Sequence, residues 1–145
     1  MLIAIIGESC TGKSTLADKL KGQFNATVYT GKDYLRLAKS PAEAEAVFKK
    51  LLAESVDGEN VIYVISESEH LALLPENCFK ILVTAPLSVI KERFAARMRG
   101  ILPPPVEAML ERNHGKFDGI QCDFHYENAD GYSALEDKIR STKCK

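Results

Sequence analysis

The chain has 145 residues, with 19 Lys and Arg against 20 Asp and Glu, and a formal net charge of −1. This length suits one ordinary domain, and the balanced charge disfavours a dedicated nucleic-acid-binding protein, which usually carries a strong basic excess. The longest purely apolar runs, such as residues 61–65, are about a quarter of the roughly 20 residues that a membrane span needs, and no targeting segment is evident. We therefore expect one domain over residues 1–145, cytoplasmic, with no membrane or nucleic-acid partner and an oligomeric state that the sequence leaves open.

In the first half of the chain, short apolar runs alternate with helical patterns. The pattern predicts a strand at 2–6, a helix at 13–22 that stops at Gly22, a strand at 26–30, a weak helix at 32–39 and a helix at 42–55. The run at 2–6 is continuously apolar, which is typical of a strand buried on both faces. Pro41 suits the first turn of the helix that follows it.

The second half continues the alternation. It predicts a strand at 61–65, a short segment around 71–74, a strand at 79–84, a helix at 86–99, a helix at about 105–113, a strand at about 122–127 and a helix at about 132–142. Strands separated by helices form βαβ units, so we expect an α/β fold: a three-layer α/β/α domain around a five-stranded parallel sheet.

The cysteines are scattered: Cys10, Cys78, Cys122 and Cys144. They form no C-x-x-C pair and do not cluster with histidine, so the pattern predicts neither a zinc site nor a disulfide framework. Reduced thiols in a cytosolic protein are the expectation.

The most informative segment, residues 7–14, reads Gly-Glu-Ser-Cys-Thr-Gly-Lys-Ser and matches G-x-x-x-x-G-K-S. It follows the first predicted strand and opens the first helix, as this phosphate-binding motif requires. The glycines let backbone N–H groups face a polyphosphate, Lys13 supplies a cation for the β and γ phosphates, and the Ser14 hydroxyl is a ligand for Mg²⁺. We expect the phosphates to lie against Gly7, Ser9, Cys10, Thr11, Gly12, Lys13, Ser14 and Thr15.

The motif alone does not separate a GTPase, a motor ATPase and a small-molecule kinase. A GTPase would carry D-x-x-G and N-K-x-D motifs, and residues 113–116 (Asn-His-Gly-Lys) are only superficially similar to the second. Motor ATPases are mostly larger. A kinase is the remaining class.

Residues 30–36 read Thr-Gly-Lys-Asp-Tyr-Leu-Arg and resemble the S-T-G-D-x-x-R segment of adenylate kinases, with Lys32 inserted. More loosely they resemble the acceptor segment of cytidylate and shikimate kinases. The chain is thus similar to the nucleoside-monophosphate-kinase-like P-loop kinases, which implies the strand order 2-3-1-4-5, ATP as donor, Mg²⁺ and a small acceptor. The resemblance implies that Asp33 and Arg36 bind the acceptor. Alternatively, the two form an i,i+3 salt bridge on a helix surface.

Four basic residues crowd one short stretch: Lys91, Arg93, Arg97 and Arg99. Similar kinases place arginines at the start of a lid, where they neutralise the charge of the transferred phosphoryl group. We expect Arg97 and Arg99 to do so, in a short lid at about 97–105, with Arg112 a weaker candidate. The alternative is a solvated basic face.

Two further sites follow strand ends. Glu67, after the strand at 61–65, either holds a magnesium-bound water or caps a helix, and Asn128 either contacts the base or makes a turn. We interpret His70, His114 and His125 as structural.

Together these features predict a kinase that transfers the γ-phosphoryl group of ATP to a small acceptor, such as a nucleotide, a nucleoside or a similar metabolite. The acceptor-binding segment is about 32–56, and the catalytic residues are Lys13, Asp33, Arg97 and Arg99. The alternative is a nucleotide-binding regulatory or partner protein, or a slow NTPase, that phosphorylates no acceptor.

Overall fold

The computed structural model describes residues 1–143, so Cys144 lies outside the described residues. The strands are β1 (Leu2–Ile6), β2 (Thr27–Thr30), β3 (Val61–Ile65), β4 (Phe79–Val83) and β5 (Phe124–Tyr126). The α-helices are α1 (Lys13–Phe24), α2 (Pro41–Ser55), α3 (Leu87–Arg97), α4 (Pro104–Asn113) and α5 (Tyr132–Lys143). Three short 3₁₀-helices are η1 (Asp33–Leu37), η2 (Ser68–Leu73) and η3 (Ala129–Gly131).

The five strands pair in parallel in the order β2-β3-β1-β4-β5, which confirms the predicted architecture. Every residue of β1 and of β3 is buried. This burial explains their continuous apolar sequences, since a central parallel strand is covered on both faces. The predicted bounds of these two strands are confirmed.

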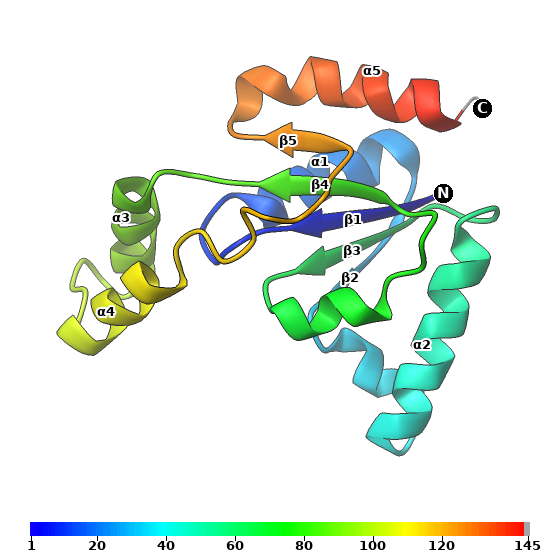
Figure 1. Cartoon of the computed structure of the whole chain (residues 1–145), viewed down its shortest axis with the longest axis horizontal. Coiled ribbons are helices and arrows are strands. Elements are labelled where there is room, and N and C mark those ends of the chain that lie inside the picture. The colour runs from blue at the N-terminus through cyan, green and yellow to red at the C-terminus, as the bar shows by residue number, and fades with distance from the viewer. Residues whose placement is uncertain (144–145) are drawn as a thin grey trace.

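Helices cover both faces of the sheet, with α1 and α5 on one side and α2 on the other (Figure 1). The first face is closed by side chains such as Leu16 and Leu20 of α1 and Leu135 of α5. The second is closed by Phe48 and Leu52 of α2 together with η2 and the segment between α4 and β5. The sheet therefore has two separate apolar cores, one on each face.

Several element bounds differ from the predictions. Gly22 does not end α1, which continues to Phe24 because that ring is buried in the first core, and Asn25 takes the left-handed conformation at φ 52°. The helix predicted at 86–99 begins after Pro86 and ends at Arg97. The weak helix at 32–39 is the shorter 3₁₀-helix η1, and the strand at 122–127 is only the three residues of β5.

Helices α3 and α4 form a hairpin beyond the carboxyl ends of the strands (Figure 1). Arg99 and Gly100, both at positive φ, turn the chain after α3. A small third core of Cys10, Ile90 and Leu110 joins the hairpin to the loop between β1 and α1. Within residues 1–143, no helix is both long and apolar enough to cross a membrane.

Candidate phosphate-binding site

The loop between β1 and α1 has a conformation that requires glycine at two positions. A Cβ atom at Gly7 would lie 2.4 Å from the backbone oxygen of Val83, and Gly12 has a φ of 99°. The Gly7 N–H donates to the carbonyl oxygen of Ile65 at 3.1 Å, which ties the loop to the end of β3. Cys10 also takes positive φ, at 64°. The result is a curled loop at the N-terminus of α1, where unpaired N–H groups favour an anion.

The amine of Lys13 lies inside this loop. It donates a hydrogen bond to the backbone oxygen of Glu8, which also accepts the Thr11 hydroxyl at 2.8 Å. The side chain is only 6% exposed, and this burial lowers the pKa of Lys13 from 10.5 to about 8. The positive charges of Lys116 and Arg97 lower the pKa further, while Cys10 and Glu8 oppose them. A buried lysine with two cations nearby would be stabilised by an anion.

The Glu8 side chain makes a contact that the sequence does not predict. Its carboxylate accepts the Gly115 N–H at 3.1 Å and lies 3.3 Å from Nδ1 of His114. Glu8 therefore joins the loop of residues 7–12, the phosphate loop, to the segment after α4, more than a hundred residues later. No local pattern could have identified this pair, because only the fold brings the two segments together.

A pocket of about 520 Å³ opens beside the loop. Several of the predicted site residues line it: Cys10, Thr11, Gly12, Thr15, Arg97 and Asn128. Arg93, which the sequence placed only in a basic cluster, lines the same pocket and donates to the Cys10 backbone oxygen at 3.1 Å. Arg99 is exposed past the end of α3 and is not among the described residues that line this pocket.

The basic stretch of α3 is divided between two roles. Lys91 contacts Glu111 at 2.6 Å and Glu107 at 3.4 Å, so it joins α3 to α4. The hydrogen bond that Lys91 donates to the Glu111 carboxylate raises the pKa of Lys91. Arg93 and Arg97 instead line the pocket beside the phosphate loop, and both are also exposed to solvent.

The acceptor candidates pair with one another. Asp33 accepts the Thr30 N–H at 2.9 Å and lies 3.7 Å from Arg36, whose side chain is 81% exposed. This is the i,i+3 pair considered above. It lies just after β2, at the same edge of the sheet as the phosphate loop.

The other candidates lie at strand ends. Glu67 is exposed and precedes η2, directly after β3. Asn128 accepts the Asp130 N–H at 2.9 Å and also lines the pocket. It therefore makes the turn that was one alternative, and it does so at the edge of the pocket. His70 is buried against Tyr34 and Tyr63.

The two remaining histidines and the cysteines complete the sequence-predicted residues. His125 lies 2.6 Å from the Thr84 hydroxyl, and His114 contacts Glu8. Cys10, Cys78 and Cys122 are free thiols. Among the described residues, no three His, Cys, Asp or Glu side chains gather as a metal site.

Comparison with known proteins gives structural likeness only, since no family model and no curated protein matches this sequence. An uncharacterized protein from Eubacterium ventriosum aligns with a TM-score of 0.67 at 16% identity, over 100% of this chain and 99% of that one. Shikimate kinase from Acinetobacter baumannii, solved with shikimate, aligns with a TM-score of 0.65 at 14% identity, over 99% of this chain and 95% of that one. A gluconokinase from Sinorhizobium meliloti aligns with a TM-score of 0.61 at 14% identity, over 97% of this chain and 93% of that one. The fold is that of the P-loop small-molecule kinases.

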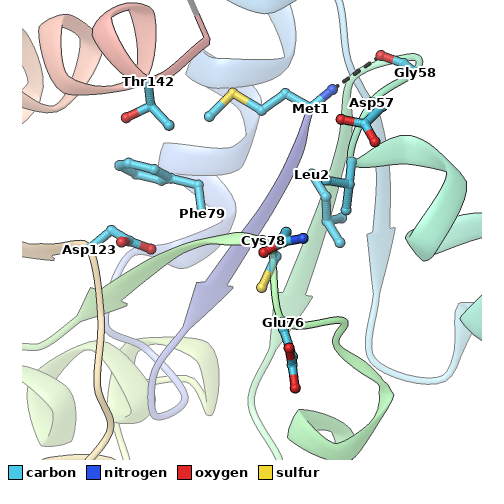
Figure 2. Close-up of a pocket in the computed structure, with 11 residues that line it drawn as sticks. Met1, Leu2, Asp57, Gly58, Glu76, Cys78, Phe79, Asp123 and Thr142 are labelled. Atoms are coloured by element: carbon cyan, nitrogen blue, oxygen red, sulfur yellow. Dashed lines mark hydrogen bonds between the residues drawn. The ribbon is translucent and has the colours of Figure 1, made fainter. Parts of the chain in front are cut away.

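A second pocket, larger than the one beside the phosphate loop, lies away from that loop. It has a volume of about 620 Å³ and is lined by the amino ends of β1 and β4, with the carboxylates of Asp57, Glu76 and Asp123 around it (Figure 2). The phosphate loop follows the carboxyl end of β1, so the two sites lie at opposite edges of the sheet. The predicted phosphate-binding residues therefore adjoin the smaller pocket beside the loop.

Proposed function

We propose that the chain is an ATP-dependent small-molecule phosphotransferase of one domain, with an acceptor that is a nucleotide, a nucleoside or a similar metabolite. The observation that carries this proposal is Lys13, almost fully buried within a curled glycine loop and near two further cations. Desolvated positive charge at the N-terminus of a helix is suited to a polyphosphate, whose charge compensates the cost of burying the lysine.

On the donor side, the amides of residues 9–15 and the Lys13 amine hold the phosphates. The first helical hydrogen bond runs from the Leu16 N–H to the Gly12 oxygen, so the N–H groups of residues 9–15 are available for ligand oxygens, whereas the Gly7 N–H is engaged by the Ile65 oxygen. The pocket lined by Arg97 and Asn128 takes the nucleoside, with Asn128 beside the base.

Mg²⁺ fits the donor set here. Ser14, the second residue of α1, is exposed beside Lys13, and Glu67, two residues after β3, would hold a metal-bound water. With a single hydroxyl as protein ligand, the ion would take its remaining ligands from water and phosphate, as Mg²⁺ commonly does. When bound, Mg²⁺ neutralises charge on the β and γ phosphates.

On the acceptor side, Asp33 orients or deprotonates the attacking hydroxyl, and Arg36 holds an anionic group if the acceptor carries one. The segment 32–56 supplies this site. The short lid at 97–105 brings Arg97 and Arg99 to the transferred phosphoryl group, where their charge stabilises the transition state.

A second candidate is a nucleotide-binding regulatory protein or slow NTPase. The mutual pairing of Asp33 and Arg36 favours it, because both acceptor groups are already engaged with protein partners. In that case the protein would bind ATP through the same loop but transfer no phosphoryl group to a metabolite.

An acceptor screen separates these candidates. The protein is incubated with ATP, Mg²⁺ and a panel of nucleotides, nucleosides, sugars and hydroxy acids, and products are read by mass spectrometry. A phosphorylated acceptor that Lys13→Ala abolishes supports the kinase. Binding without turnover supports the regulatory protein, and phosphate release without an acceptor supports the NTPase.

A further inference from the structure

The segment between α4 and β5 is held firmly beside the phosphate loop. Phe117 is 2% exposed and packs into the core that α2 covers. Two residues earlier, Gly115 takes a φ of 83°, and a Cβ there would lie 2.9 Å from the Asp118 carboxylate. The Asp118 N–H donates to the Gly115 oxygen at 3.0 Å. Buried anchor and tight turn together fix where residues 114–118 lie.

The Glu8 side chain also holds this segment in place. The carboxylate is 11% exposed, and it accepts the Gly115 N–H and contacts His114. A nearly buried carboxylate is costly unless it is paired, so this contact constrains both segments. The same residue uses its backbone oxygen to hold Thr11 and Lys13. One residue thus connects the phosphate loop, its lysine and the distant segment.

Lys116 lies in the chain between Gly115, which Glu8 holds, and the buried Phe117. It follows Gly115, its backbone N–H donates to the Asn113 oxygen at 3.1 Å, and its amine lies 5.1 Å from the centre of the Phe117 ring. Lys116 is exposed, and its amine rests near this ring. Its charge is close enough to act on Lys13.

We propose that Lys116 is a second phosphate-binding lysine of this site, and that Glu8 is the positioning residue that holds it there through Gly115 and His114. This inference rests on the proposed nucleotide site and adds a cation from outside the loop motif. Lys116 reaches the terminal phosphates from the segment between α4 and β5, whereas Arg93 and Arg97 reach the loop from α3. Glu8 itself touches no phosphate.

The test exploits the sign of the Glu8 charge. Removing a carboxylate near a polyphosphate should strengthen binding, because it removes a Coulomb repulsion between two anions. If Glu8 instead positions Lys116, Glu8→Ala should weaken binding, Glu8→Gln should retain most of it, and Glu8→Ala should cost nothing further in a Lys116→Gln background. Inorganic tripolyphosphate with Mg²⁺ is the probe, because it has no base, and ATP with Mg²⁺ is measured alongside by calorimetry.

We expect Lys116→Gln to weaken both ligands about tenfold, the usual worth of one charge-assisted contact. Lys138→Gln, at an exposed lysine on α5, is the matched control and should change neither. A melting curve checks folding, and Glu8→Asp, whose shorter carboxylate cannot reach Gly115, replaces Glu8→Ala if that variant does not fold.

The outcomes are distinct. If Lys13→Ala abolishes binding but Lys116→Gln leaves it unchanged, this inference is wrong and the proposed function stands. If Glu8→Ala tightens binding, or adds to the loss from Lys116→Gln, Glu8 is not a positioning residue. If the unmodified protein binds neither ATP nor tripolyphosphate, the proposed function itself fails, and this inference fails with it.

Discussion

Arg93 of α3 donates a hydrogen bond of 3.1 Å to the backbone oxygen of Cys10, a loop residue at positive φ. The bond joins the first helix of the α3–α4 hairpin to the middle of the phosphate loop. Cys10 also packs against Ile90 and Leu110 of the same hairpin. The conformation of the loop is therefore partly set by a helix that lies some eighty residues later in the chain.

Replacing Arg93 should loosen this connection. We expect Arg93→Ala to weaken ATP binding by about fivefold, on the order of one lost hydrogen bond, and to speed amide exchange in residues 7–14. Calorimetry and hydrogen exchange measure the two effects. Glu92→Ala, the exposed neighbour on α3, is the control. Equal exchange rates in Arg93→Ala and the unmodified protein would contradict this role.

Two glycines, one in the loop and one in the last turn of α1, should respond to alanine in opposite directions. Gly7→Ala places a Cβ 2.4 Å from the Val83 oxygen, so we expect a loss of at least about 2 kcal/mol in unfolding free energy. Gly22→Ala lies within α1 with nothing within 4 Å of the new Cβ, and should stabilise by about 0.5–1 kcal/mol. Urea unfolding of both variants checks the pair, and a Gly7→Ala protein as stable as its parent would refute the tight contact.

The buried charge of Lys13 predicts a pH-dependent stability. Because the folded-state pKa is about 8 against 10.5 for the free side chain, the folded protein carries a penalty below about pH 8, on the order of 3 kcal/mol. Between these values the folded state has lost the proton that the unfolded state keeps, so the penalty fades as pH rises.

Lys13→Met removes this penalty along with ATP binding. We expect the variant to be more stable than the parent at about pH 7, and the difference to shrink towards about pH 10. Urea unfolding at both pH values gives the comparison, and effects of alkali on other groups cancel in the difference. A gap that stays constant or widens would show that the lysine is not desolvated in the folded protein.

Arg36 offers a clean probe of the acceptor site. Its side chain is 81% exposed and its 3.7 Å contact with Asp33 is a surface ion pair, so Arg36→Ala should change stability by less than about 0.5 kcal/mol. If Arg36 binds the acceptor, the same variant should raise KM for the acceptor about tenfold or more while the KM for ATP stays unchanged. Steady-state kinetics on the acceptor found by screening decides this. Unchanged KM values would show that Arg36 does not bind the acceptor and only pairs with Asp33.

Much of the fold was predictable because its signals are local. The strands at 2–6 and 61–65 are continuous apolar runs, and the phosphate loop is a fixed spacing of glycines and a lysine. The end of α1 was not predictable, since Phe24 is held in the helix by a core formed from distant strands and α5. The same holds for Glu8 with Gly115 and for Arg93 with Cys10, which depend on contacts that no sequence window contains.

The resting position of Lys13 has a consequence for how a nucleotide would enter. Its amine already donates one of its three N–H groups to the backbone oxygen of Glu8. The bond to this neutral carbonyl holds the cation in place before a ligand arrives, and two donors remain for phosphate oxygens. A phosphate that draws the amine out of the loop would lose this bond, and the net affinity would then be smaller than the new contacts suggest.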